Sequence, residues 1–282
     1  MAFDNRYFDQ IALAERIAEA TYGTKVSVWQ KGKALGKFGR NRTVGTSYET
    51  VAEFQGATAQ ETFVTTNIID SISSSDAADT SKSFVIEGHT ISTTGELPFV
   101  IQTATTDATD GRTKVALTTP LARATRIYLK ASGTFASPQT THAGTIYVYD
   151  DTDGITIGVP NTAAATKILL LPGETQSEKC STSISDKDFW FIDRFNASIG
   201  NSGGGANRVT LRIETRRVSE GGAWRPTGSE IVLVVGQSAV EREFVPVLVV
   251  PSNSDVRVVA KSNLNTAEVS AQISGFLAIV RG

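Results

Sequence analysis

The stretch from Phe244 to Val280 reads FVPVLVVPSNSDVRVVAKSNLNTAEVSAQISGFLAIV and decides the class of fold. In its last part, every second residue from Val269 to Ile279 is apolar or glycine, while Ser270, Gln272 and Ser274 hold the other parity. Side chains on a strand point alternately to opposite faces, so this pattern predicts a sheet strand with one buried face. From residue 276 onward both parities are apolar, which predicts that the strand end is covered on both faces. The residues expected to be covered there, by a core or by a neighbouring subunit, are Phe276, Ala278 and Val280.

The chain before this stretch supplies further strands. Short runs rich in Thr and β-branched residues recur, and Gly, Asp or Pro separates them about every 8 to 15 residues. No pattern for crossover helices lies between them, so the sequence predicts an all-β protein of antiparallel β-sandwich or jelly-roll-like units. The Ser- and Asp-rich interval from Ser71 to Ser83 is predicted to be a loop.

The number of expected strands predicts two sandwiches, because a sheet usually holds about four to six strands. The boundary is expected near residues 160–166. The predicted organisation is an N-terminal helix and basic arm over residues 1–45, a first sandwich over 46–163 and a second over 164–282.

One helix is predicted, from Asp9 to Tyr22, with Gly23 as its natural end. Its narrow apolar stripe contains Ile11, Ala14 and Ala18. Two interpretations stay open, namely docking on a partner's surface and packing on the chain's own domain.

A basic, glycine-containing arm follows the helix. It has no acidic residue from Lys25 to Arg42, and an acidic protein surface, nucleic acid or plain solvent could face it. Its cations, together with the apolar stripe of the helix, form the predicted partner contact. These cations are Lys25, Lys31, Lys33, Lys37, Arg40 and Arg42.

The bulk composition narrows the functional classes. The 282 residues carry a formal charge of −2, from 27 basic and 29 acidic residues, which argues against a globally basic nucleic-acid binder. The single cysteine, Cys180, allows no internal disulfide. The polar start and the lack of an apolar run of about 20 residues predict no secretion signal and no membrane span.

No motif predicts catalysis, a metal or a cofactor. His89 and His142 are too far apart in sequence for typical zinc spacing. His89 is expected at a strand end and His142 in a loop, and both are interpreted as surface or loop residues. Asp150–Gly154 fails the calcium-loop pattern at its first and twelfth positions, so it is predicted to be a hairpin turn. Gly203–Gly205 lacks the following Lys and helix of a phosphate loop. We therefore expect a protein that is not an enzyme.

Several segments together resemble a family of uncharacterised virion structural proteins of tailed bacteriophages. These segments are Phe38–Val51, Asp79–Gly88, Gly144–Val148 with Pro172–Ser177, and Val250–Arg257 with Val269–Phe276. Their order and spacing carry the resemblance. It implies a non-enzymatic component of the virion. Within the virion we expect a capsid decoration (cement) protein on the outer head surface, which binds the major capsid protein and itself, with a homotrimer as the expected assembly. The resemblance also implies assembly in the host cytoplasm and a place in the virion.

Other functions stay open at this point. One is a tail, neck or fibre-anchor protein made of similar sandwiches. Another is a carbohydrate-binding adhesin, for which Trp224 beside Arg225, and Tyr147 with Tyr149, are the candidate aromatic groups. A glycan depolymerase ranks last, because nothing marks a carboxylate cluster.

Overall fold

The computed structural model describes most of the chain. The described ranges are 5–23, 26–27, 33–55, 61, 63–130, 141–202, 208–217, 222–234, 239–264 and 266–280. Residues 5–11, 26–27, 201–202 and 280 are described by their backbone alone.

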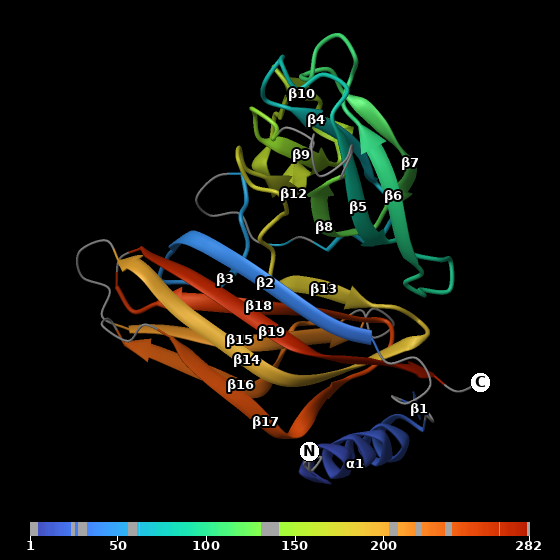
Figure 1. The fold of residues 1–282 in the computed structure, drawn as a ribbon, viewed down its shortest axis with the longest axis vertical. Coiled ribbons are helices and arrows are strands. Elements are labelled where there is room, and N and C mark those ends of the chain that lie inside the picture. The colour runs from blue at the N-terminus through green and yellow to red at the C-terminus, as the bar shows by residue number, and fades with distance from the viewer. Residues whose placement is uncertain are drawn as a thin grey trace, which may run out of the picture. The chain divides into compact units, whose positions relative to one another are not determined.

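The described residues form an all-β fold with one α-helix, as predicted, and the chain forms two compact units (Figure 1). The first unit contains residues 1–51, 95–97 and 180–282, and the second contains 52–94 and 98–179. The predicted boundary at 160–166 is wrong, since it falls inside the second unit, where the strand after it pairs with residues 146–149. The second unit is an insertion into the first.

The first unit is built from two antiparallel sheets (Figure 1). One sheet has the order β2 (Lys33–Val44), β19 (Ala267–Val280), β14 (Asp188–Ser202) and β17 (Val240–Val250), and β1 (Val26–Ser27) also pairs with β19. The other has the order β13 (Ser181–Ile184), β18 (Ser254–Ser262), β15 (Arg208–Arg217) and β16 (Arg225–Val234), and β3 (Glu49–Thr50) also pairs with β18.

These eight longer strands have the connectivity of a jelly roll. Counted along the chain, the first sheet places them in the order first, eighth, third, sixth, and the second sheet in the order second, seventh, fourth, fifth. Two four-stranded antiparallel sheets interleaved in this way form the double Greek key of an eight-stranded jelly roll. The inserted unit therefore interrupts the jelly roll between its first and second long strands.

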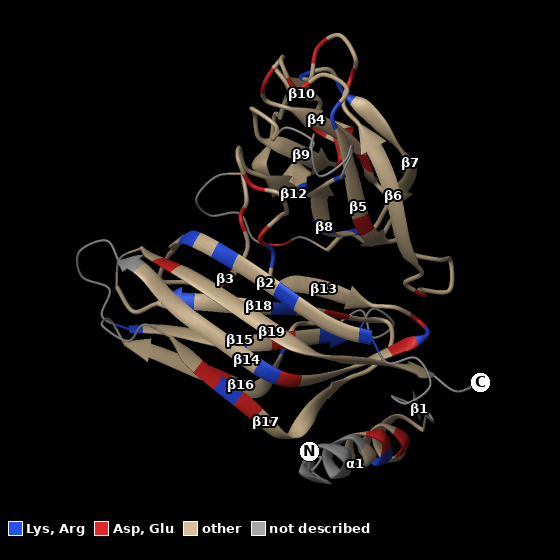
Figure 2. Ribbon diagram, in the orientation of Figure 1, with Lys and Arg blue, Asp and Glu red and all other residues tan. Residues whose placement is uncertain are grey.

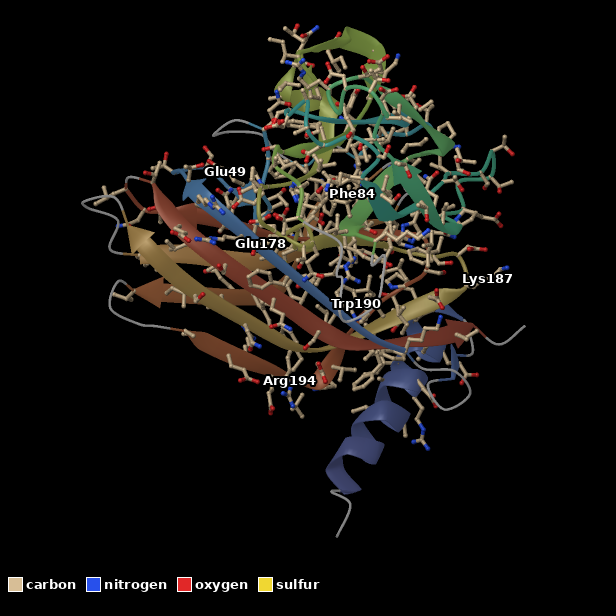
Figure 3. All side chains as sticks on the ribbon, turned by 45° about the horizontal axis from the view of Figure 1, so that its top comes forward. Glu49, Phe84, Glu178, Lys187, Trp190 and Arg194 are labelled. Atoms are coloured by element: carbon tan, nitrogen blue, oxygen red, sulfur yellow. The ribbon has the colours of Figure 1, made fainter. Side chains whose placement is uncertain are left out.

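The core of the jelly roll lies between the two sheets, where alternate residues of each strand face inward. Trp190 is fully buried there (Figure 3). Phe195 is buried in the same core with Val269, Ala271 and Ile273 of β19. The alternation predicted for β19 is confirmed by this burial. Each large side chain buried in such a core contributes about 1.5–3 kcal/mol.

Helix α1 (Asn5–Tyr22) accounts for the apolar residues on both faces at the end of β19, because it packs on one of these faces. It ends at Gly23, as predicted, with a positive φ of 65°. Ala14 and Ala18 are fully buried in one cluster with Ala278 and Phe191, on the outer face of the first sheet. The second face of the strand end is thus covered at Ala278 by this chain's own helix.

The second unit is a smaller antiparallel sandwich. Its four-stranded sheet has the order β12 (Thr166–Leu170), β9 (Ile146–Tyr149), β4 (Ile69–Ser74) and β7 (Val115–Leu121). Its three-stranded sheet has the order β6 (Phe99–Thr105), β5 (Ser83–His89) and β8 (Arg123–Leu129). A hairpin of β10 (Ile155–Thr156) and β11 (Val159–Pro160) and the 3-10 turns η1 (Asp151–Asp153) and η2 (Ala163–Ala165) complete it.

The second unit has its own apolar core, which includes Phe84 (Figure 3) and Ile72. The predicted loop over Ser71–Ser83 is wrong in its first part, because β4 extends to Ser74 and its serines are buried. Their hydroxyls are satisfied inside, since Ser73 Oγ donates to the Gly158 carbonyl at 2.8 Å. The polar composition of this segment therefore led to a loop being predicted where a buried strand begins.

Candidate assembly surfaces

The predicted apolar contact surface of the helix is used within the chain. Ala14 and Ala18 are both 0% exposed, and Tyr22 packs edge-on against Phe189 with ring centroids 5.8 Å apart. Of the two interpretations left open for the stripe, packing on the chain's own domain is therefore correct, and Ala14 and Ala18 do not form the predicted partner contact. The side chain of Ile11 lies outside the described residues.

The predicted loose arm is also corrected, because residues 33–44 form β2 and pair with β19 over ten registered positions. The side chains of this strand alternate between two faces. Lys37, Gly39 and Asn41 face inward and are buried, while Phe38 and Arg42 face outward and are exposed. Lys25 and Lys31 lie outside the described residues.

The cations of β2 therefore have different environments. Lys37 is only 7% exposed, so it does not belong to a contact surface. Arg40 is half-buried and donates from Nε to Glu268 Oε1 at 2.6 Å. Lys33 and Arg42 are exposed. We name the outward side chains of this strand, Ala34, Phe38, Arg40 and Arg42, the β2 outer face.

A glycine lets β2 approach the second sheet. A Cβ at Gly39 would lie 2.2 Å from both the Cys180 amide nitrogen and the Val51 carbonyl oxygen. Cys180 is buried, and its Sγ donates to the Lys37 carbonyl at 3.4 Å. Burial raises the pKa of its thiol to about 12, so it stays protonated and unreactive in the folded protein.

The opposite edge of the same sheet carries alternating charge (Figure 2). Glu241, Arg242 and Glu243 follow one another on β17, and Arg194 of β14 lies 3.8 Å from Glu241 and 4.0 Å from Glu243. All these side chains are exposed, so the pairs contribute little to stability. Charges on an edge strand discourage pairing with another chain.

The outer face of the second sheet carries a charged and aromatic layer that no sequence motif predicted. Arg212 and Arg257 share the carboxylate of Glu214, with Nη2 atoms 2.6 Å and 2.8 Å from its two oxygens. Arg216 Nε donates to Asp255 Oδ2 at 2.9 Å. We name this set the arginine–aromatic layer: Tyr48, Arg212, Glu214, Arg216, Trp224, Asp255, Arg257 and Lys261.

Aromatic rings complete this layer. The Arg257 guanidinium carbon lies 4.1 Å from the Trp224 ring centre, and the Arg212 carbon lies 3.8 Å from that of Tyr48. Stacked guanidinium groups with shared carboxylates form a preorganised, rigid surface. Alternation of Arg212 and Glu214 was visible in the sequence, but their cross-strand partners were not.

The aromatic residues that were candidates for carbohydrate binding are buried or packed against arginine side chains. Tyr147 is 8% exposed and Tyr149 is 0% exposed, both inside the second unit. Trp224 packs against arginine rather than presenting an open face. These positions do not form an exposed aromatic groove.

The second unit buries an ion pair. Lys179 Nζ donates to Glu61 Oε1 at 2.7 Å and to the carbonyls of Ala124 and Lys167 at 2.8 Å and 2.9 Å. All three ammonium hydrogens thus have acceptors. Burial lowers the pKa of the neighbouring Lys167.

Both histidines are buried, which contradicts the expectation of surface positions, although His142 lies in a loop and His89 at a strand end, as predicted. His89 is 3% exposed at the end of β5, with its ring centre 5.2 Å from that of Phe99. His142 is 2% exposed and lies with Nδ1 2.6 Å from the Gly144 carbonyl oxygen. Among the described residues, no three His, Cys, Asp or Glu side chains cluster as metal ligands.

The acidic turn after β9 is a capped 3-10 turn. Asp150 Oδ1 accepts from the Thr152 amide at 3.0 Å, and Gly154 has a positive φ of 71°. The prediction of a turn is confirmed, but the prediction of a hairpin is wrong, because β9 pairs with β4 and β12 while β10 pairs with β11. In the part of the chain that the structure describes, no helix is long and apolar enough to cross a membrane.

Comparison with known proteins gives no family assignment. No protein-family model matches, and no curated protein matches. Among solved structures, the chain aligns with a structure of the infectious bursal disease virus Gt strain. The sequence identity is 13%, the alignment covers 94% of this chain and 77% of the other, and the TM-score is 0.24. The crystal structure of the infectious bursal disease virus VP2 subviral particle aligns at 12% identity, over 95% and 77% of the two chains, with a TM-score of 0.20. Scores this low do not establish a common fold.

Proposed function

We propose that this chain is a structural protein of a virus particle that acts by assembly and not by catalysis. The observation that carries the proposal is the eight-stranded jelly roll, interrupted after its first long strand by a second sandwich. Jelly rolls are a common architecture of viral capsid and lectin domains. The aromatic residues that were candidates for carbohydrate binding are buried or stacked on arginine, which favours a capsid function over a lectin function.

Within the particle, the proposed role is decoration of the outer head surface of a tailed bacteriophage, with the major capsid protein as partner. The sequence resemblance supports this role. A protein that binds only the assembled shell stabilises it by mass action, and many copies allow each contact to be weak.

The β2 outer face is the proposed contact with an acidic region of the capsid protein. It places an exposed aromatic, Phe38 at 42% exposure, on the same strand face as Arg40 and Arg42. Aromatic residues and arginine are enriched in protein interfaces. The proposed contact with the capsid protein is thus made by the face of a strand, whereas the sequence predicted a loose basic arm.

Particle composition tests this role. We expect the chain in purified particles at a copy number in the hundreds, on the head surface in cryo-electron microscopy maps. A copy number of about a dozen or fewer would place it in a neck or tail, where ring symmetry sets the count. Absence from particles would refute the virion function altogether.

A binding experiment tests the contact surface. The double variant Phe38→Ser/Arg42→Ser should lose most occupancy on heads that lack the wild-type chain. Leu264→Ser, at a 50% exposed leucine on the β18–β19 connection, is the matched control and should bind normally. Equal binding by both variants would remove the β2 outer face from the proposal without touching the virion function.

A further inference from the structure

The hairpin of β10 and β11 turns at a residue type that disfavours such a turn. Its two central residues are Ile157 and Gly158, with positive φ angles of 51° and 74°, which is the pattern of a type I′ turn. Asn, Asp or Gly is usual at the first of these positions, because a branched side chain collides with the backbone at positive φ. Of the non-glycine residues with a positive φ in the described part of the chain, only Ile157 is β-branched. The turn therefore holds backbone strain at this isoleucine.

The strained side chain faces solvent. Ile157 is 66% exposed, so burial in the chain's own core does not offset the strain. A single exposed isoleucine on a regular strand needs no explanation. Strained backbone positions, by contrast, concentrate at binding sites, where they present a side chain to a partner. Exposure and strain at one residue together indicate a contact site.

The backbone beneath Ile157 is fixed. The Gly158 carbonyl accepts from Ser73 Oγ at 2.8 Å, and a Cβ at Gly158 would lie 1.8 Å from the Ser74 carbonyl oxygen. Ile155 and Val159, on either side of the turn, pack against the cluster of Tyr147, Tyr149 and Leu169. A side chain held on a rigid turn loses little conformational entropy when it binds.

Acidic residues lie at the start of this hairpin (Figure 2). The 3-10 turn η1 leads directly into β10, and Asp150, Asp151 and Asp153 belong to this turn and its N-terminal cap. Asp151 pairs with Lys114, so three carboxylates and one ammonium group leave a net charge of −2. We name residues 150–160 the acidic hairpin.

Neighbouring charges do not cancel this acidity. Arg112 lies beside Gly158, but it is paired with Asp110 at 2.9 Å and adds no net charge. Asp70 Oδ1 accepts from the Asp151 amide at 3.4 Å, which adds a further carboxylate near the hairpin. The acidic hairpin therefore offers one apolar side chain beside a negative surface.

The arginine–aromatic layer of the first unit has the matching chemistry. Its four cations and two carboxylates leave a net charge of +2. The carboxylates lie beneath the cations, since the Glu214 and Asp255 side chains are 4% and 0% exposed and those of Arg212 and Arg216 are 26% and 20% exposed. The half-buried rings of Tyr48 and Trp224 supply apolar surface. This layer is basic and aromatic where the hairpin is acidic and aliphatic.

We propose that the acidic hairpin of one copy of this chain docks on the arginine–aromatic layer of a second copy, with Ile157 against its aromatic rings. An apolar anchor flanked by complementary charges gives a contact both affinity and orientation. The two surfaces differ, so the contact is heterologous, and its repetition about a rotation axis builds a closed set of copies.

Ile157→Asn should change stability and association in opposite directions. Asn tolerates a positive φ, so the urea midpoint of unfolding should rise. The anchor is lost, so the dissociation constant measured by analytical ultracentrifugation of the full chain should rise at least about tenfold. Ile101→Asn, at a 60% exposed isoleucine of the regular strand β6, is the matched control. It should lower the midpoint slightly and leave association unchanged.

A charge swap tests which surface receives the hairpin. Asp153→Lys on the exposed part of the hairpin and Lys261→Glu on the layer should each weaken association at least about fivefold, because each change removes a complementary charge and introduces a like one. An equimolar mixture of the two variants should associate more strongly than either alone, since each altered surface then meets an oppositely charged one.

Several outcomes would overturn the inference. These are a wild-type chain that stays monomeric at high concentration, normal association of the Ile157 variant, and a mixture that associates no better than its components. Association that depends on Ile157 but not on Lys261 would place the hairpin on another surface and would also overturn it. The inference concerns self-association alone, so its failure would leave the proposed virion function intact.

Discussion

At the scale of single residues, close backbone approach is a strong constraint in the jelly roll. Gly39 allows β2 to lie against Val51 and Cys180, and Gly275 allows β19 to lie against Phe191, whose carbonyl oxygen would be 1.9 Å from an added Cβ. Neither glycine has a positive φ. Their role is to leave room, which a sequence pattern does not reveal.

Gly39→Ala should therefore destabilise the protein. The new methyl group would meet backbone atoms of a neighbouring segment, and overpacking of this kind costs about 1–3 kcal/mol. Gly36→Ala on the same strand is the control, because its nearest neighbour would be the Gln272 Nε2 atom at 4.0 Å. Urea unfolding measures both, and equal midpoints would contradict the close approach.

The buried ion pair of the second unit makes a separate prediction. Lys179→Met leaves the Glu61 carboxylate buried without its lysine, which should cost about 3–5 kcal/mol in unfolding free energy. Arg126→Met is the control, since Arg126 is 42% exposed and lies 3.6 Å from Glu87, so its loss should cost at most about 1 kcal/mol. The double variant Lys179→Met/Glu61→Gln should recover part of the loss. No recovery would mean that the lysine acts through packing alone.

At the scale of elements, α1 and β2 show that a local sequence pattern can be compatible with more than one position in the fold. The alanine stripe of α1 packs on its own sheet, and the basic run after it forms a strand. Among the described side chains, α1 contacts the sheet through the two small alanines and through the ring of Tyr22.

Ala18→Asp should undock α1 while the jelly roll stays folded. The charge would be placed at a fully buried position against the apolar cluster that includes Phe189. We expect faster proteolysis within residues 5–22 and stronger binding of a hydrophobic dye. Ala20→Asp, on the exposed side of the same helix, should behave as the wild type. Unchanged proteolysis of the Ala18 variant would show that the helix is held by other contacts.

At the scale of the whole molecule, the insertion is the main architectural fact. The second unit has its own core cluster, and an antiparallel bridge pairs Ala52 with Lys179 at its two ends. Paired ends allow a unit to be removed without stretching the chain that remains.

The fragment 52–179 should therefore fold alone, and the remaining chain with a short Gly-Ser linker in its place should keep the jelly roll. Cooperative thermal unfolding of each piece is the measurement. A matched cut at the sequence-predicted boundary, 1–163, separates β12 from β9 and should yield an unfolded product. Cooperative folding of that piece would contradict the division into units.

Local pattern determined a good part of this protein. Alternation predicted the sheet strand after Val269, glycine predicted the helix end at residue 23, and the composition predicted an all-β chain. These features depend on neighbours in sequence, because side-chain direction and backbone conformation repeat with a short period. The resemblance to virion proteins likewise rests on short segments in order.

Only the tertiary structure decided which elements meet. Alternation identifies the two faces of β19 but not its partners, and no alternation predicted β2 as a strand. The burial of Lys37, the packing of α1 over Ala278 and the interruption of the jelly roll therefore could not be predicted from the local pattern. Strand pairing and helix docking join residues far apart in the chain, and many partners satisfy the same local pattern. The choice among them is made by the packing of the complete core.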